Sequence, residues 1–136
     1  VRSNLVDYNF KVSNTILNSQ SNILKNIYES KNDFYTSSRG IDECNIVVSK
    51  NLCPLVEKEL VDEFCINKTE QLSAISFKLP EENVSVPGIY YYVFQKLSWE
   101  GININQVIST SNEFTILVSE SEVDKAFSII NKLKSI

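Results

Sequence analysis

Apolar and polar residues alternate along two stretches of this chain, and the two stretches are alike. The first is Leu5–Val12, and the second is Leu72–Leu79, which lies 67 positions later. Alternation with a period of two predicts strands that bury one face. A second similar pair is found at Glu43–Ser49 and Glu113–Ser119, 70 positions apart. Two strands that recur in the same order predict an internal duplication.

Between the strands of the first half, apolar residues recur at intervals of three and four, which predicts two amphipathic helices. One follows Asn14, the expected N-cap, and the other has Pro54 in its first turn, where proline is tolerated. Short strands are expected at Phe34–Ser38 and Glu43–Val48. The apolar residues of the two helices are Ile16, Leu17, Ile23, Leu24, Ile27 and Tyr28, then Leu55, Val56, Leu60, Val61 and Phe64.

The second half repeats this order. A helix after Pro87-Gly88 precedes strands at Ile102–Ser109 and Glu113–Ser119. A last helix follows Ser119-Glu120-Ser121-Glu122, whose spacing fits a capping box. The buried faces of the two helices are expected to carry Ile89, Tyr92, Val93 and Leu97, then Val123, Ala126, Phe127, Ile130 and Leu133.

Each half also needs a closing strand. Phe64-Cys65-Ile66 is expected to be a short strand that closes the first half, whereas no strand follows Ile136. The strand missing from the second half is expected to come from Val1–Asn4 or from residues upstream. Each half then has two helices on one face of a four-stranded antiparallel sheet, which is an α/β fold of the α+β sandwich type with ferredoxin-like βαββαβ units. The expected domains are residues 1–67 and residues 68–136.

Two of the three glycines stand at predicted junctions. Gly88 lies where a strand passes into a helix, and Gly101 lies where that helix passes into the next strand. Pro87-Gly88 would expose the unpaired N–H groups of a helix start, which can receive a carboxylate or another anion. A plain helix-start turn explains the same two residues.

Two asparagines follow Gly101. Asn103 and Asn105 are two positions apart on a predicted strand, so we expect them on one face, with Ile102 and Ile104 on the other. Amides at a strand start beside a helix N-terminus suit the ammonium and carboxylate groups of an amino acid. Solvated side chains on an edge strand are the alternative.

The helix between these junctions is rich in aromatic residues, which cover more than one of its faces. A helix that is apolar nearly all round is usually buried on more than one side. Packing against the other half or against another chain is favoured over an aromatic cage for a ligand. The residues are Tyr90, Tyr91, Tyr92, Phe94 and Trp99.

Composition narrows the classes of function. A net charge of −4 and a pI near 4.9 argue against a nucleic-acid partner for this segment. No apolar run approaches the roughly 18 residues of a membrane span. With no histidine and no close cysteine pairing, neither a metal site nor a cofactor is expected, and Cys44, Cys53 and Cys65 are expected to be buried free thiols of a cytoplasmic protein.

Catalysis finds no support in the sequence, which has no serine nucleophile elbow and no glycine loop for phosphate. The segment is therefore expected not to be an enzyme. Because it contains no methionine, it is expected to be part of a longer protein, and the function of the whole protein could lie in the part upstream.

The motifs of the second half together resemble an ACT domain, and the nearest likeness is the tandem ACT regulatory region of aspartate kinases. The resemblance rests on Val86-Pro87-Gly88, Gly101-Ile102-Asn103-Ile104 and Ile108-Ser109-Thr110-Ser111. It implies a pocket with Val86, Pro87, Gly88 and Ile89 on the loop side and Asn103, Ile104 and Asn105 on the strand side. It also implies an amino-acid ligand and a homodimer formed by joining sheets.

The first half carries Val12-Ser13-Asn14-Thr15 where the second half has its Pro-Gly signature. One functional site per chain is therefore expected. The resulting hypothesis is that the segment is a regulatory module. It would bind a small molecule, an amino acid, and control an attached or partner domain. The alternatives are a structural oligomerisation module without a ligand and a regulatory fragment of an aspartate kinase.

Overall fold

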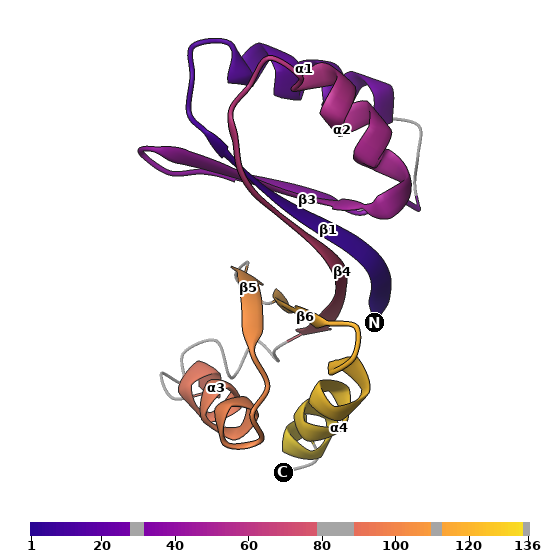
Figure 1. The fold of residues 1–136 in the computed structure, drawn as a ribbon. Coiled ribbons are helices and arrows are strands. Elements are labelled where there is room, and N and C mark those ends of the chain that lie inside the picture. Colours follow the sequence, from indigo (N-terminus) through magenta and orange to yellow (C-terminus); the bar gives the residue numbers. More distant parts are fainter. Residues whose placement is uncertain (28–31, 79–88, 110–112, 135–136) are drawn as a thin grey trace. The chain divides into compact units, whose positions relative to one another are not determined.

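Figure 1 shows the computed structural model, which describes residues 1–27, 32–78, 89–109 and 113–134, with only the backbone at 89, 90, 133 and 134. The chain divides into two compact units. Asn4–Gln71 form one, here called the N-terminal unit. Val1–Ser3 and Leu72–Ile136 form the other, here called the C-terminal unit. Both are α+β, with antiparallel strand pairs and helices.

The N-terminal unit has its strands in the order β2-β3-β1-β4. Its elements are β1 (Arg2–Lys11), α1 (Ile16–Ile27), β2 (Tyr35–Arg39), β3 (Glu43–Ser49), a 3-10 turn (Lys50–Leu52), α2 (Cys53–Glu59) and the first part of β4 (Cys65–Lys78). In Figure 1, α1 and α2 lie on the same side of these strands.

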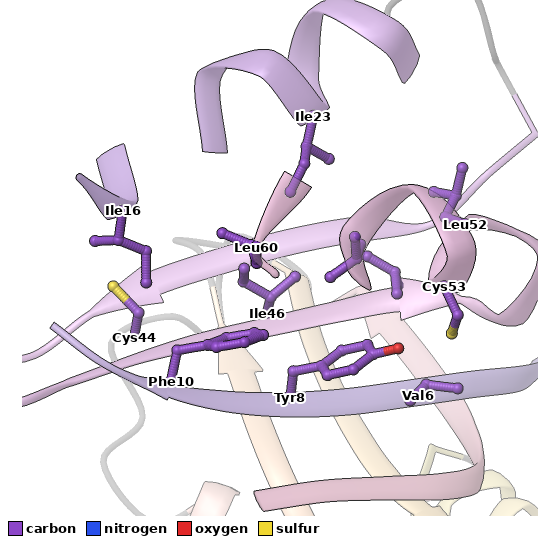
Figure 2. Packing of buried hydrophobic residues seen from close by; sticks show 12 residues of the cluster. Val6, Tyr8, Phe10, Ile16, Ile23, Cys44, Ile46, Leu52, Cys53 and Leu60 are labelled. Atoms are coloured by element: carbon purple, nitrogen blue, oxygen red, sulfur yellow. The ribbon is translucent and has the colours of Figure 1, made fainter. Parts of the chain in front are cut away.

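Strand β1 supplies the centre of the N-terminal core. Val6, Tyr8 and Phe10 alternate along it and are at most 3% exposed. Figure 2 shows the rings of Tyr8 and Phe10 beneath Ile46 and Leu60, and the two ring centroids are 5.8 Å apart. Helix α1 meets this surface with Ile16, Gln20 and Ile23, one per turn. Each large apolar side chain buried in this way contributes about 1.5–3 kcal/mol to folding.

The C-terminal unit has the strand order β4-β6-β5. Its elements are the end of β4, α3 (Ile89–Trp99), β5 (Ile104–Ser109), β6 (Glu113–Ser119) and α4 (Val123–Lys134). Phe114 is at the centre of its core, with ring centroids 5.1 Å from Phe77 and 5.7 Å from Phe94. The beginning of β1 belongs to this unit and neighbours β4 in the strand order, as expected for the missing strand.

The central strands of the two units pair in the same register. In the N-terminal unit, β1 and β3 pair from Leu5↔Ser49 to Lys11↔Glu43. In the C-terminal unit, β4 and β6 pair from Leu72↔Ser119 to Lys78↔Glu113. The two strand pairs therefore correspond position for position, with β1 matching β4 and β3 matching β6. Asn4 in β1 and Gln71 in β4 lie directly before these paired stretches, and both have left-handed backbone, with φ of 58° and 57°.

Several sequence-based expectations are wrong in detail. Helix α2 ends at Glu59 because Leu60 leaves the helical region, with φ −107° and ψ 21°. Val61 and Phe64 therefore lie beyond it and are 73% and 68% exposed. Thr15, rather than Asn14, precedes α1, and its carbonyl accepts the first helical bond from the N–H of Ser19 at 3.2 Å.

The closing strand of the N-terminal unit is present but longer than expected. It starts at Cys65 and continues without a break as the 14-residue strand β4, whose second part was predicted separately. The N–H of Lys11 donates to the carbonyl of Phe64 at 2.9 Å, which joins the end of β1 to the start of β4.

Candidate functional site

The loop side of the predicted pocket is only partly described. Val86, Pro87 and Gly88 lie outside the described residues, as do Thr110 and Ser111. Helix α3 begins at Ile89, directly after Gly88, as the sequence predicts.

The other end of α3 stops at a glycine turn. Gly101 has φ +75°, and its N–H donates to the carbonyl of Ser98 at 3.0 Å. The N–H of Ile102 donates to the carbonyl of Leu97 at 3.0 Å, and both side chains are buried in the same core. This pair of bonds is a Schellman motif, which satisfies carbonyls at the helix end and needs a left-handed residue. The predicted junction at Gly101 is therefore confirmed.

The three strand-side residues do not lie on a simple strand. Asn103 precedes β5 and is exposed, while Ile104 is half-buried against the core and pairs with Val118. The register then shifts between Ile104 and Gln106, so half-buried Asn105 is the additional residue of a β-bulge. The expectation that Asn103 and Asn105 share one strand face is wrong, because the bulge breaks the alternation.

The start of α4 binds the segment that leads into β5. Glu122, the residue before α4, accepts a hydrogen bond from the N–H of Asn103 through Oε2 at 3.3 Å. Lys125 donates from Nζ to the backbone carbonyl of Glu100 at 2.9 Å. The same Nζ is 3.8 Å from the side-chain carboxylate of Glu100. A lysine at a helix C-terminus stabilises the exposed carbonyls there.

Sequence reasoning missed this arrangement. Glu122 was considered only as part of a capping box for α4. In the structure its carbonyl accepts the N–H of Ala126 at 3.0 Å, so Glu122 itself occupies the cap position. Its carboxylate instead reaches Asn103. Nothing in the sequence pattern singled out Lys125.

Among the side chains of α3 that the structure describes, the buried ones lie on one face. Val93 and Leu97 are buried, whereas Tyr91, Tyr92 and Trp99 are more than half exposed. Tyr92 was expected on the buried face, and that expectation is wrong. The Nζ of Lys96 lies 5.3 Å from the ring centroid of Trp99, a cation–π contact.

In the N-terminal unit, the corresponding turn from strand to helix contains a carboxylate. The hydroxyls of Ser13 and Thr15 both donate to Glu63, and Thr15 Oγ1 is 3.0 and 3.1 Å from its two carboxylate oxygens. Glu63 comes from the turn between α2 and β4, nearly fifty residues along the chain. No short-range sequence signal predicts this contact.

The N-terminal core also buries a polar atom away from this turn. The hydroxyl of Tyr8 has no hydrogen-bond partner among the described residues. In Figure 2 it points toward the side of the cluster where Cys53 lies. Burial raises the pKa of Tyr8 above its ordinary value, and the neighbouring Cys53 thiol acts in the same direction. Burial likewise raises the pKa of Tyr35.

Other chemical groups do not gather into a site in the part of the chain that the structure describes. No cluster of histidine, cysteine and carboxylate side chains there could hold a metal ion. Cys44 and Cys53 are buried free thiols as expected, but Cys65 is exposed, which corrects the expectation for the third. Among the described helices, none has the length and apolar character needed to cross a membrane.

Comparison with known proteins identifies the C-terminal segment. A family model described as ACT domain matches residues 68–132. The resemblance read from the sequence is thereby confirmed for the segment that contains all the predicted site residues. A search of curated protein sequences finds no match to this chain.

Solved structures with a similar fold include aspartate kinases and their regulatory parts. Aspartate kinase from Clostridium acetobutylicum superimposes with a TM-score of 0.74 at 17% identity, covering 95% of this chain and 32% of that one. The ligand-free regulatory subunit of aspartate kinase from Thermus thermophilus gives 0.70 at 11% identity, with 96% and 91% covered. The chain thus spans about a third of the Clostridium kinase. The TM-scores show a shared fold, and at such low identities they show the fold alone.

Proposed function

We propose that the chain is a regulatory module built from two ACT-type units, and that its C-terminal unit binds an amino acid or a similar small molecule. The bulge at Asn105 is the observation that carries this proposal. Bulges concentrate beside binding sites, where they change the direction of a side chain or end the pairing of a strand. The ACT family match includes this strand and the loop before α3.

In this proposal the ligand lies between the start of α3 and the start of β5. Val86, Pro87, Gly88 and Ile89 form the loop side, where N–H groups at the start of α3 receive the ligand carboxylate. Asn103, Ile104 and Asn105 form the strand side. The carboxylate of Glu122, next to Asn103, adds a negative charge suited to the ligand ammonium group.

The regulatory output follows from differential affinity. A ligand that binds one arrangement of the module more tightly shifts the population toward it, by at most its difference in binding free energy between arrangements. An attached catalytic domain, as in an aspartate kinase, or a separate partner would respond to that shift. A homodimer joined through the sheets of the units and a cytoplasmic location belong to the same proposal.

Calorimetric titration with the common amino acids tests the binding site. We expect one amino acid to bind the wild type and to raise its melting temperature, since a ligand at 100 times its Kd stabilises by about 2.7 kcal/mol. Gly88→Trp should abolish binding by filling the loop side. Deleting Asn105 should weaken binding while circular dichroism stays unchanged. Absence of binding by any amino acid to the wild type would remove the sensing proposal.

A second candidate is a structural oligomerisation module, and the exposed aromatic residues of α3 favour it. Tyr91, Tyr92 and Trp99 would then be covered by another chain. Sedimentation of wild type and the triple alanine variant separates the two functions. Loss of association without any loss of amino-acid binding would assign α3 to assembly alone.

A further inference from the structure

The turn that joins β1 to α1 is the N-terminal counterpart of the proposed ligand loop. It consists of the four residues 12–15, whereas in the sequence ten residues lie between Lys78 of β4 and Ile89 of α3. The shorter turn has no Pro-Gly, and two of its four residues carry hydroxyl groups. Both hydroxyls bind the same carboxylate, that of Glu63.

The geometry of this contact is that of a carboxylate bound by two donors. Ser13 Oγ binds one oxygen of Glu63 and lies 3.1 Å from the other, and Thr15 Oγ1 lies within 3.1 Å of both. Each hydroxyl has a single proton and an ionised carboxylate only accepts, so two hydrogen bonds form at a time. Bonds to a charged acceptor are roughly twice as strong as neutral ones.

The carboxylate also lies at the beginning of a helix of 12 residues. Thr15 immediately precedes α1, and its own N–H is 3.4 Å from Ser13 Oγ, which completes a chain of polar groups leading to Glu63. The negative charge is therefore placed at the positive end of the α1 dipole, where an anion is stabilised.

The backbone around Glu63 is held in position by further bonds. The N–H of Glu63 donates to the carbonyl of Leu60 at 3.0 Å, and the next carbonyl, of Phe64, accepts from Lys11 at 2.9 Å. On the other side of the turn, the N–H of Val12 donates to the carbonyl of Asp42 at 2.9 Å. The side chain thus starts from an ordered turn, which lowers the entropy lost when it binds the hydroxyls.

We propose that Glu63 is a built-in carboxylate that closes the strand-to-helix turn of the N-terminal unit, so that this unit accepts no external ligand. The exclusion of a ligand rests on the proposed function of the C-terminal unit. The closure of the turn by Glu63 does not, and it can be tested without any amino acid.

Chemical rescue tests the closure. Glu63→Ala should lower the melting temperature, and sodium acetate should restore at least half of that loss relative to sodium chloride at equal ionic strength. The wild type and Glu59→Ala, which changes another half-buried glutamate of the same unit, should show no selective effect of acetate. Equal melting temperatures of Glu63→Ala in the two salts would overturn the proposal.

A double-mutant cycle keeps the test decisive if the alanine variant folds poorly. Glu63→Gln should cost less stability than Glu63→Ala, because one acceptor oxygen remains. In a variant that already carries Ser13→Ala and Thr15→Val, Glu63→Gln should cause no further loss of stability. Additive losses of stability would mean that Glu63 acts elsewhere, and would overturn the proposal.

The stoichiometry of calorimetric titration addresses the exclusion of a ligand. We expect one amino acid per wild-type chain, and two per chain would contradict closure. If no amino acid binds at all, the proposed function fails, whereas the acetate experiment and the cycle still decide the role of Glu63.

Discussion

The N-terminal and C-terminal units agree in their central strands and differ in the connections between them. The pairs β1–β3 and β4–β6 have matching registers over seven residue pairs each. In contrast, four residues of the sequence separate β1 from α1, whereas ten lie between Lys78 of β4 and Ile89 of α3. Strand β5 also contains a bulge at Asn105, whereas β2 pairs with β3 without a register shift.

This difference shows where each unit was free to change. A one-residue slip of a central strand would move every buried side chain to the opposite face, so packing maintains the register. Connections run over the surface and tolerate insertions, and they commonly carry binding residues. The longer intervening sequence and the bulge both occur in the unit to which we assign the ligand, and the built-in carboxylate occurs in the other.

The largest expected effect comes from the matched core residues Phe10 and Phe77, which occupy corresponding positions in the two registers. Changing either to alanine should cost about 3–5 kcal/mol of unfolding free energy, because each is nearly fully buried. Denaturant unfolding measures the loss, and hydrogen exchange should locate it in the unit that carries the change. Phe64→Ala, at an exposed site, should cost under about 0.5 kcal/mol.

A smaller effect is expected at the glycine that ends α3. Gly101→Ala should cost about 1–2 kcal/mol because a side chain disfavours its φ of +75°, although a Cβ there would meet no atom within 4 Å. Gly40→Ala is the control in the N-terminal unit, where the nearest atom would be 3.5 Å away and φ is not left-handed. Equal losses at both glycines would show that conformation at Gly101 is unimportant.

The smallest effect concerns Tyr8, which occupies the place that Ile75 has in the C-terminal unit. Tyr8→Phe should stabilise the protein by about 1 kcal/mol at neutral pH, since it removes a buried hydroxyl without a partner among the described residues. The gain is measured by denaturant unfolding. A loss of stability would show that the hydroxyl forms a bond in solution.

The same residue predicts a pH dependence. The pKa of Tyr8 is higher in the folded than in the unfolded chain, so the unfolded chain loses its proton first as pH rises. The folding stability that Tyr8 contributes is fully present below about pH 10, the ordinary pKa of tyrosine. Above that pH it falls by about 1.4 kcal/mol per pH unit. Tyr8→Phe should reduce that alkaline slope, leaving the part that Tyr35 contributes.

The sequence predicted those elements whose burial follows a simple period. Alternation located β1 and the second part of β4, the repeated similar pair located β3 and β6, and Gly101 marked the end of α3. A bulge cannot be read in this way, because it is defined by the partner strand: Asn105 looks like an ordinary strand residue until β6 is paired with β5.

The other points on which the sequence-based predictions failed have a similar physical origin. Val61 and Phe64 continue the apolar pattern of α2, but the helix had already ended at Glu59, and the pattern alone does not show which apolar residues will be exposed. The contact of Glu63 with Ser13 and Thr15 joins segments that only the folded sheet brings together. Local periodicity carries no information about such a pair.

The way in which the chain is divided between the two units has a consequence for folding during synthesis. The N-terminal unit is one uninterrupted segment, Asn4–Gln71, whereas the C-terminal unit needs Val1–Ser3 together with Leu72–Ile136. On the ribosome the first unit can fold as soon as its own residues emerge, since domains fold as units from the N-terminal end. The second must bring Val1–Ser3 together with Leu72–Ile136, a contact of long sequence separation that slows folding. Residues 1–3 therefore stay unpaired within their own unit until the strands of residues 72–136 have been made.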